Sequence, residues 1–395
     1  MTALAELLHE IYLWDYLTTV TKPIVLYGMG NGADEILDRC AVRHIPVAGV
    51  FASDEFVRGQ QFRGFTVKTY KQLHQELGDF IILIAFASEL PDILKRFYHL
   101  AQQHETYAPH LPLFGDKEIV SPQWLQDRLP HLEAVYDRLA DEESRQCMLH
   151  ILRYKLTGRL SELAFVTDRR QDLEQLFAFG PKETYGDLGA YNGDTVAEFL
   201  ELTNGHYEHI YAVEPDSKNF VKLQRFVELE QLRNCSLLQR GIWRDEEELP
   251  FAAKGGRMSA LDGKGKKTTP VTSLDAIIGS RDFTYIKMDV EGAEKEAIEG
   301  GRNVITRCRP KLLIAGYHHD DDLWQIPELL WNLVPEYRIY LRRHPYVPCW
   351  EINFFAACGG EKVKSEEVAF GRIRPPLGAG NRAWHGGGGK QSLLI

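Results

Sequence analysis

The sequence has few of the features that mark secreted or membrane-spanning proteins. Its 395 residues include only six cysteines, which are scattered and form no Cys-x-x-Cys pair. This spacing argues against a disulfide framework or a zinc site and is typical of reduced thiols. No apolar run approaches the roughly 20 residues that a membrane span needs, and Phe80–Ala87 has the length of a buried parallel strand. We therefore predict a cytoplasmic protein with no membrane span.

Positive charge is also scarce. The chain has 46 Lys and Arg against 56 Asp and Glu, a net charge of −10. Nucleic-acid binding needs clustered basic side chains, so we predict no nucleic-acid partner. Lys264, Lys266 and Lys267 form one local cluster in a glycine-rich stretch, 254–267, that predicts a mobile loop. These lysines would suit an anionic acceptor, although a loop charge run is more often simply solvated.

The chain is long enough for two domains and connectors. Its start, MTALAELLHEIYLWDYL, is interrupted by charges and predicts an amphipathic helix, not a signal peptide. A strand at 23–27, a glycine turn from Gly28 to Ala33 and a helix at Asp34–Val42 follow. A second strand, Val47–Phe51, is followed by Asp54. This order predicts a small Rossmann-like domain over residues 1–117.

The glycine turn of this first domain has two interpretations. It is consistent with nucleotide or sugar-nucleotide binding, with Asp54 near a ribose hydroxyl. The glycines equally suit tight strand–helix packing in a module with no ligand or a regulatory one, and we favour this interpretation. An NAD-dependent oxidoreductase ranks last, because no hydride-transfer constellation follows the strands.

Residues 118–178 change to helical periodicity. Trp124–Leu139 and Glu142–Leu156 have apolar residues at three- and four-residue spacing, and Asp141 or Ser144 could cap the second helix. We expect a helical connector that packs on one or both flanking domains. Residues 359–395 are glycine-rich with little apolar content, which predicts a disordered tail.

Residues 179–358 alternate strands and helices. The first strand, Thr184–Leu188, leads into the turn Gly189–Gly193 and a helix at Asp194–Leu202. Four further strands are predicted at His209–Val213, Cys235–Gln239, Thr284–Met288 and Lys311–Ala315, and two closing antiparallel edge strands at Tyr337–Leu341 and Glu351–Ala357. We predict a second, larger α/β domain.

Acidic residues end three of these strands: Asp187, Glu214 and Asp289. Ligands of open α/β sheets lie at the carboxyl ends of the strands. S-adenosylmethionine carries an amino group, two ribose hydroxyls and an adenine, all of which can donate to carboxylates, and Glu214 is placed for the ribose. Phosphate-rich ligands would be repelled by this acidic edge.

The segments DLGAYNGDT, YAVEPD, IKMDVEGAE and KLLIAGYHHDDDLWQIPELL resemble, in order and spacing, the FkbM-type methyltransferases. These are class I S-adenosylmethionine-dependent enzymes that generally methylate hydroxyl oxygens. The resemblance covers about 183–357. The glycine-rich first half and the connector resemble longer members, in which a Rossmann-like module precedes the catalytic domain. The resemblance implies a seven-stranded mixed sheet with a reversed last hairpin.

The resemblance also implies cofactor contacts by motif. They fall at Asp187, Gly189, Gly193, Glu214 and Asp289, with Tyr191 in the same turn. The sequence departs from the family late in the chain. Members commonly have a histidine-rich segment and a Glu-Thr pair there, whereas this chain has Arg342-Arg343-His344-Pro345 and Trp350-Glu351-Ile352. The acceptor pocket is therefore less well defined by sequence than the cofactor site.

A hydroxyl acceptor benefits from a general base. His318 is our first candidate because it follows the fifth strand and titrates near neutrality; Glu291 is second, and His319 is a further alternative. His318 could equally cap the next helix or bond the loop. For Glu291, favourable placement at a helix N-terminus is the more economical interpretation.

Two other groups have a functional and a structural interpretation. Asp289, Glu291, His318 and Asp320 could converge on a divalent metal, but without a tighter spacing rule we predict no metal site. Tyr317, Trp324 and Trp331 could stack on a sugar, although helical spacing favours core packing for the two tryptophans.

The function predicted from sequence is O-methylation of a hydroxyl on a small-molecule or glycan acceptor, such as a glycan, glycolipid or secondary metabolite. The alternative is a nucleotide-sugar-binding protein with a degenerate methyltransferase domain.

Overall fold

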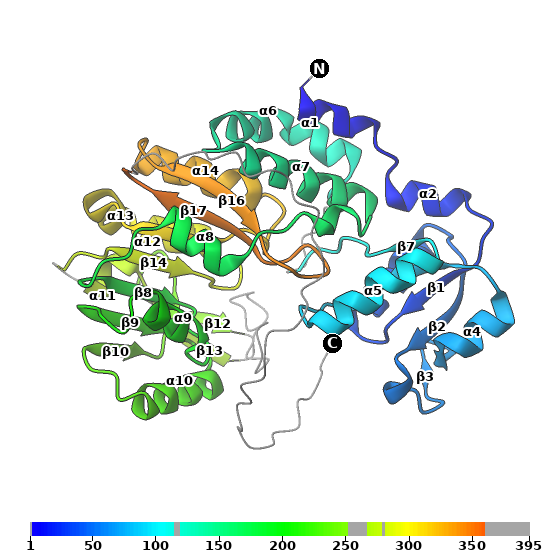
Figure 1. The fold of residues 1–395 in the computed structure, drawn as a ribbon, viewed down its shortest axis with the longest axis horizontal. Coiled ribbons are helices and arrows are strands. Elements are labelled where there is room, and N and C mark those ends of the chain that lie inside the picture. The colour runs from blue at the N-terminus through cyan, green and yellow to red at the C-terminus, as the bar shows by residue number, and fades with distance from the viewer. Residues whose placement is uncertain (1, 114–118, 252–266, 279–280, 360–395) are drawn as a thin grey trace.

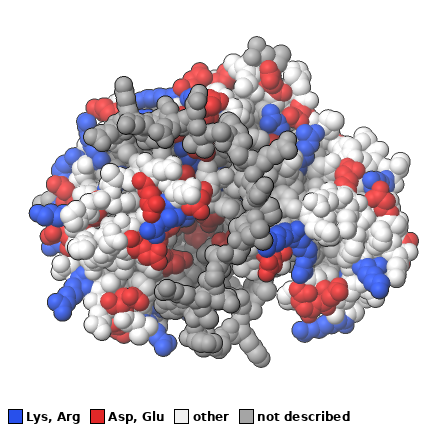
Figure 2. All heavy atoms as spheres, in the orientation of Figure 1, with Lys and Arg blue, Asp and Glu red and all other residues white. Residues whose placement is uncertain are grey.

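The computed structural model describes residues 2–113, 119–251, 267–278 and 281–359. Two α/β domains, each built on one β-sheet, lie at opposite ends of the molecule, with a group of helices between them (Figure 1). The predicted disordered tail, apart from Gly359, lies outside the described residues, as do Lys264 and Lys266 of the predicted mobile loop. On the face shown in Figure 2, acidic and basic side chains are interspersed. Every helix in the described ranges is too short or too polar to cross a membrane.

The N-terminal sheet has five parallel strands in the order β5-β2-β1-β6-β7. Its elements are β1 (Ile24–Tyr27), α3 (Asn31–Val42), β2 (Val47–Ala52), η2 (Asp54–Phe56), the hairpin β3 (Gln61–Phe62) and β4 (Phe65–Thr66), β5 (Lys68–Thr69), α4 (Tyr70–Leu77), β6 (Ile81–Ile84), α5 (Pro91–Gln103) and β7 (Thr106–Tyr107). The predicted strand–turn–helix opening is confirmed. Helix α3 begins three residues earlier than predicted, at Asn31, inside the predicted glycine turn.

The prediction of one continuous first helix is wrong. The chain forms α1 (Ala3–Glu6), the 3-10 turn η1 (Leu7–His9) and α2 (Leu13–Thr19), because Glu10 and Tyr12 take extended backbone conformations. The break lets the apolar residues of both halves become buried. Tertiary burial therefore overrides the local helical periodicity.

The connector is helical, as predicted. It contains α6 (Pro122–Arg138), α7 (Glu142–Thr157), η3 (Glu162–Ala164) and α8 (Arg169–Leu176). Asp141 caps α7 by accepting a hydrogen bond from Ser144 N at 2.8 Å. Ser144 Oγ accepts from Leu341 N at 2.9 Å, which ties α7 to the second sheet. One buried apolar cluster runs from the N-terminal sheet through α6 and α7 into this sheet, so the connector packs on both domains.

The second sheet has seven strands in the order β10-β9-β8-β14-β15-β17-β16. The strands are β8 (Thr184–Leu188), β9 (His209–Val213), β10 (Cys235–Leu238), β14 (Tyr285–Met288), β15 (Lys311–Ala315), β16 (Arg338–Arg343) and β17 (Ile352–Ala357). The first five are parallel, and β17 is antiparallel to both β15 and β16. The seven-stranded mixed sheet is confirmed. Of the two closing strands predicted at an edge, only β16 is there, because β17 lies between β15 and β16.

Helices cover the second sheet, and a small sheet that was not predicted lies beside it. The helices are α9 (Asp194–Leu202), α10 (Ser217–Leu229), α11 (Leu274–Ile278), α12 (Glu294–Gly300), α13 (Arg302–Cys308) and α14 (Asp322–Leu333). The small sheet has the order β11-β13-β12, with β11 (Gly241–Ile242), β12 (Glu247–Phe251) and β13 (Lys267–Thr272). All six cysteines are free thiols, as their spacing predicts.

Candidate functional site

A cavity of about 430 Å³ lies at the carboxyl ends of β8, β9 and β14. This is the edge at which ligands of open α/β sheets bind. Four of the six predicted cofactor residues line it: Gly189, Tyr191, Glu214 and Asp289. The predicted acidic edge is therefore one wall of a real cavity.

Asp187 lies beneath this wall and does not line the cavity. Its side chain is fully buried; Oδ2 accepts a hydrogen bond from Thr195 Oγ1 at 2.6 Å, and Oδ1 lies 3.4 Å from Lys287 Nζ. Burial raises the pKa of this carboxyl above its ordinary value. Thr195 and Lys287 both line the cavity, so Asp187 is placed to act on a ligand through them.

Lys287 is a site residue that the motif analysis missed. It is almost fully buried, and its Nζ donates to Gly189 O at 2.7 Å, which fixes the turn after β8. Although burial by itself lowers the pKa of Lys287, the nearby carboxylates of Asp187 and Asp289 raise it above its ordinary value. A lysine inside an otherwise apolar buried strand was the available signal.

The glycines of the turn are needed first for packing within the protein. Gly189 has φ +85°, and a Cβ there would lie 1.9 Å from the carbonyl oxygen of Asp289. Gly193 has φ +94°, is the N-cap of α9, and a Cβ there would lie 2.5 Å from the ring of Phe226. Gly193 is outside the cavity lining. Both glycines therefore have an intramolecular role that does not depend on a ligand.

Glu214 faces the cavity from the end of β9. Its Oε2 accepts from Tyr191 N and its Oε1 from Asp216 N, both at 2.9 Å. Burial raises the pKa of Glu214 to about 7, and these two backbone bonds oppose the rise only in part. The two amides hold the carboxylate in one orientation toward the cavity.

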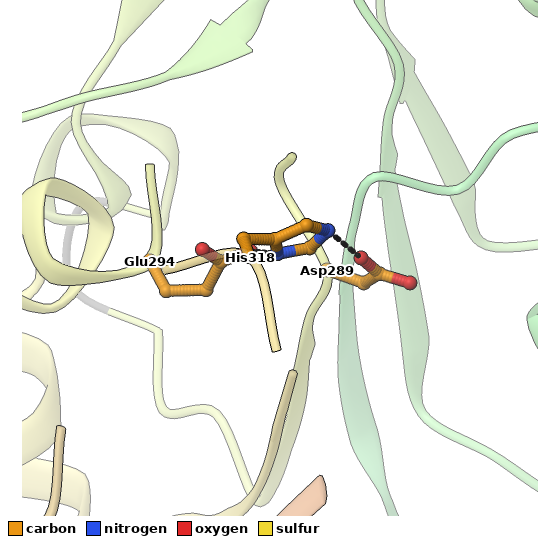
Figure 3. A group of neighbouring side chains, drawn as sticks. All are labelled: Asp289, Glu294 and His318. Atoms are coloured by element: carbon orange, nitrogen blue, oxygen red, sulfur yellow. Dashed lines mark ion pairs between the residues drawn. The ribbon is translucent and has the colours of Figure 1, made fainter. Parts of the chain in front are cut away.

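His318 lies behind the cavity wall and does not line it. The side chain is 2% exposed; Nδ1 is 3.0 Å from Glu294 Oε1, and Nε2 is 3.6 Å from both Asp289 Oδ1 and Glu291 Oε2. Figure 3 shows the ring between Glu294 and Asp289. Burial alone lowers the pKa of His318, but the surrounding carboxylates outweigh it and raise the pKa well above the ordinary value. A protonated imidazole cannot accept a further proton.

Glu291, the second candidate for the base, does line the cavity. Its backbone has φ +56°, in the left-handed region that non-glycine residues seldom adopt. Burial raises the pKa of Glu291 to about 7, and the neighbouring His318 lowers it in part. Of the two candidates, Glu291 is therefore the one positioned to contact an acceptor.

Asp320, from the possible metal set, and His319, the further alternative for the base, lie elsewhere. Asp320 turns away from the cavity and pairs with His110, at 2.8 Å, and with Lys155. His319 Nε2 lies 3.2 Å from Gly292 O. The four residues that could have converged on a metal, Asp289, Glu291, His318 and Asp320, do not all meet, because Asp320 belongs to the junction with the connector.

The three aromatic residues have different environments. Tyr317 lines the cavity. Trp331 is buried, and its Nε1 donates to Tyr337 O at 2.9 Å. Trp324 stacks on His131 with ring centroids 4.3 Å apart. The packing interpretation of the two tryptophans is confirmed, and Tyr317 alone remains a candidate for stacking on a ligand.

A further part of the cavity wall is polar and comes from segments distant in the sequence. Arg169 of α8 forms two hydrogen bonds with Glu198, at 2.8 and 3.0 Å. The N-terminal domain contributes Glu89. The late segments that depart from the family pattern contribute His344, Pro345, Glu351 and Asn353. The sequence motifs missed Glu89 and Arg169 because both residues lie outside 183–357, the part of the chain that carries the family resemblance.

The N-terminal glycine turn is explained by packing. A Cβ on Gly28 would lie 2.9 Å from the ring of Phe86, and one on Gly32 would lie 2.5 Å from Ala85 O. Neither this turn nor Asp54 lines the strand-end cavity or the second, shallow one beside α3. These contacts support the interpretation that the glycines allow tight strand–helix packing.

Comparison with known proteins gives one family match. Residues 187–348 match the family model of the methyltransferase FkbM domain. The crystal structure of methyltransferase FkbM from Methylobacillus flagellatus KT is similar, with a TM-score of 0.66 and 21% identity, over 90% of this chain and 93% of that one. At this identity the similarity shows a shared fold. Because 90% of this chain is covered, the shared fold includes the N-terminal domain. No curated protein matches the chain.

More distant structures are similar to about half of the chain. An rRNA methylase from Streptococcus thermophilus has a TM-score of 0.34 and 12% identity, over 49% of this chain and 98% of that one. A precorrin-6y C5,15-methyltransferase from Geobacter metallireducens GS-15 has a TM-score of 0.31 and 14% identity, over 48% and 87%.

Proposed function

We propose that this chain, in which residues 187–348 form a methyltransferase FkbM domain, is an S-adenosylmethionine-dependent O-methyltransferase. Its acceptor is a hydroxyl of a glycan, a glycolipid or a secondary metabolite. The observation that carries the proposal is the fixed carboxylate of Glu214 in the cavity wall, with Asp289 at the neighbouring strand end.

The residues of the cavity fit the cofactor. Glu214 would accept hydrogen bonds from the ribose hydroxyls, since each of its oxygens retains a lone pair beyond the one used by a backbone amide. Asp289 and the turn Gly189–Tyr191 would hold the cationic methionine part, with Asp187 supporting them from below and Gly193 opening helix α9. Carboxylates in a partly enclosed cavity favour a cation over an anion.

S-adenosylmethionine supplies an activated methyl group, which the acceptor oxygen takes as the methyl–sulfur bond breaks. Glu291 would take the proton of the acceptor hydroxyl at its carboxylate, because it lines the cavity next to Tyr317. His318 would orient Glu291 from behind, at 3.6 Å. Alignment of two reactants can lower a barrier by about 7–11 kcal/mol, and the polar wall with Glu89, His344 and Glu351 is suited to hold a hydroxylated acceptor.

Calorimetry with S-adenosylmethionine and its demethylated product tests the cofactor assignment. We expect both to bind the full chain and Glu214→Ala to weaken binding at least about tenfold, the loss of one charged hydrogen-bonding group. Glu228→Ala, an exposed change on α10, is the matched control. No binding to the wild type, or unchanged binding to Glu214→Ala, would overturn the proposal.

Turnover on a panel of glycan and polyhydroxylated acceptors tests the chemistry. We expect Glu291→Gln to lower the rate by about 10²–10⁴ and His318→Ala to lower it less, both with cofactor affinity retained. Wild-type turnover in His318→Ala would remove that residue from the mechanism. Tight binding of a sugar nucleotide with no turnover on any acceptor would instead favour a binding protein with a degenerate domain.

A further inference from the structure

The loop after β14, the start of α12 and the loop after β15 bring together one imidazole and two carboxylates. One donor atom each from Asp289, Glu294 and His318 lie within 4.8 Å of one another. Figure 3 shows the two carboxylates on either side of the imidazole ring. Glu294 stands at the first position of α12, and His318 follows the last residues of β15. The motif IKMDVEGAE contains Asp289 and Glu294, but the sequence did not single out Glu294 as a site residue.

Polar atoms in this cluster are buried without hydrogen-bond partners. Glu294 is 1% exposed, and although its Oε1 accepts from Val290 N at 2.9 Å, its Oε2 has no hydrogen-bond partner in the described part of the chain. The same holds for Asp289 Oδ1, which is 3.6 Å from His318 Nε2. A buried carboxylate oxygen without a donor is costly unless a cation or a metal ion compensates it.

The charges of the cluster also do not balance. Glu291 Oε2 lies 3.6 Å from the same imidazole nitrogen as Asp289, so three carboxylates surround one ring. Even a doubly protonated imidazole contributes only one positive charge. A divalent ion would bring the cluster close to neutrality.

We propose that Asp289 and His318 Nε2 bind one divalent first-row transition-metal ion, for which Mn²⁺ is the probe, and that Glu294 holds the imidazole ring in place from its Nδ1 side. Two ligands of an ion with bonds of about 2.1 Å lie roughly 3.0–4.2 Å apart, and the 3.6 Å between His318 Nε2 and Asp289 Oδ1 is in this range. The imidazole favours a transition-metal ion over Ca²⁺, whose sites are built from oxygen.

Glu294 orients the imidazole ring in this site. Its Oε1 is 3.0 Å from His318 Nδ1, the arrangement by which a carboxylate commonly fixes the ring of a metal-bound histidine. The nitrogen on the other side of the ring, Nε2, then faces Asp289. Because Asp289 also lines the cavity, an ion bound here would lie at the cavity wall, within reach of an acceptor oxygen.

The experiment is a titration of the chelator-treated full chain with MnCl₂, with free Mn²⁺ followed by electron paramagnetic resonance and no cofactor added. We expect one bound ion per chain, with affinity reduced at least about tenfold in both His318→Ala and Glu294→Gln. Glu299→Gln is the matched control, because Glu299 is in the same helix but pairs with Arg244 at 2.7 Å. It should bind Mn²⁺ as the wild type does.

A second measurement needs no substitution. Bound Mn²⁺ should show electron spin-echo modulation from a directly coordinated imidazole nitrogen in the wild type. No saturable binding, equal affinity in both variants and the wild type, or no nitrogen modulation would each overturn the site. The inference does not rest on the proposed function: failure of Mn²⁺ binding leaves cofactor binding untouched, and failure of cofactor binding leaves the metal site standing.

Discussion

A Cβ on Gly189 would lie 1.9 Å from the carbonyl oxygen of Asp289. This contact joins the turn after β8 to the end of β14, and both residues line the cavity. The two strand ends can approach this closely only because position 189 has no side chain, and φ +85° further restricts it to glycine. The shape of the cavity floor therefore depends on one backbone contact.

Gly189→Ala should be far more damaging than the same change at another left-handed glycine. We expect a loss of at least about 3 kcal/mol in the free energy of unfolding, from backbone strain and overpacking together, and loss of cofactor binding. Gly205→Ala is the control, because Gly205 has φ +74° but nothing within 4 Å of its Cβ position. It should lose only about 1–2 kcal/mol. Urea-unfolding midpoints compare the two, and equal losses would contradict the steric argument.

Cofactor affinity should depend on pH through Glu214. Burial raises its pKa to about 7, and the ionised form is the better acceptor for ribose hydroxyls. Below pH 7 affinity should therefore fall, approaching tenfold per pH unit. Calorimetry between pH 5.5 and 8 should show this slope in the wild type and a flat, weaker profile in Glu214→Gln. A wild-type slope in the variant would assign the titration to another group.

The carboxyl of Glu214 should also make the free energy of unfolding depend on pH, but with the opposite sign: cofactor affinity rises with pH, whereas stability falls. Its pKa is 4.5 ordinarily and about 7 in the folded chain, so between these values the folded state binds more protons than the unfolded state. The contribution of Glu214 to the free energy of unfolding therefore decreases as pH rises through this window. Glu214→Gln should gain stability relative to the wild type on going from pH 5 to pH 7.5, measured by urea unfolding at each pH. If the difference in unfolding free energy between Glu214→Gln and the wild type were the same at every pH, the raised pKa would be contradicted.

Asp320 should be a major stabilising residue at the junction of the connector and the second α/β domain. It accepts from His110 at 2.8 Å and pairs with Lys155, whose side chain is 1% exposed. Asp320→Asn would leave Lys155 buried without its counter-charge and should cost about 3–5 kcal/mol. Asp15→Asn, which breaks the exposed pair with Arg43, should cost less than about 1 kcal/mol. Thermal unfolding distinguishes them, and similar melting temperatures would argue against the buried pair.

Sequence patterns predicted the sheet well where strands are buried and bounded by turns. Thr184–Leu188, His209–Val213 and Lys311–Ala315 are strands with the predicted bounds, because short apolar runs between turn residues have few alternatives. The small sheet was missed because β12 and β13 pair across a long intervening segment. Local pattern does not encode such a partner.

The site was predicted in part for a related reason. Glu214 and Asp289 follow strands directly, so topology alone places them at the ligand edge. His318 also follows a strand, but topology does not decide on which side of the loop its side chain lies, and packing against Glu294 turns it inward. Glu89 and Arg169 reach the cavity from other parts of the chain. Their position depends on how the domains pack, which no local sequence pattern predicts.

Lys287 and Asp187 should be coupled, because each is buried and compensates the other's charge. Lys287→Met removes the ammonium that lies 3.4 Å from Asp187 Oδ1 and donates to Gly189 O, which leaves a buried carboxylate without its cation. Asp187→Asn in the same chain removes that charge, so the double variant should be more stable than the sum of the two single losses predicts, by about 0.5–3 kcal/mol. Urea unfolding of the wild type, both single variants and the double variant gives this coupling energy. Additive losses would mean that Lys287 acts only through its bond to Gly189, and that the turn, not the ion pair, is what the lysine maintains.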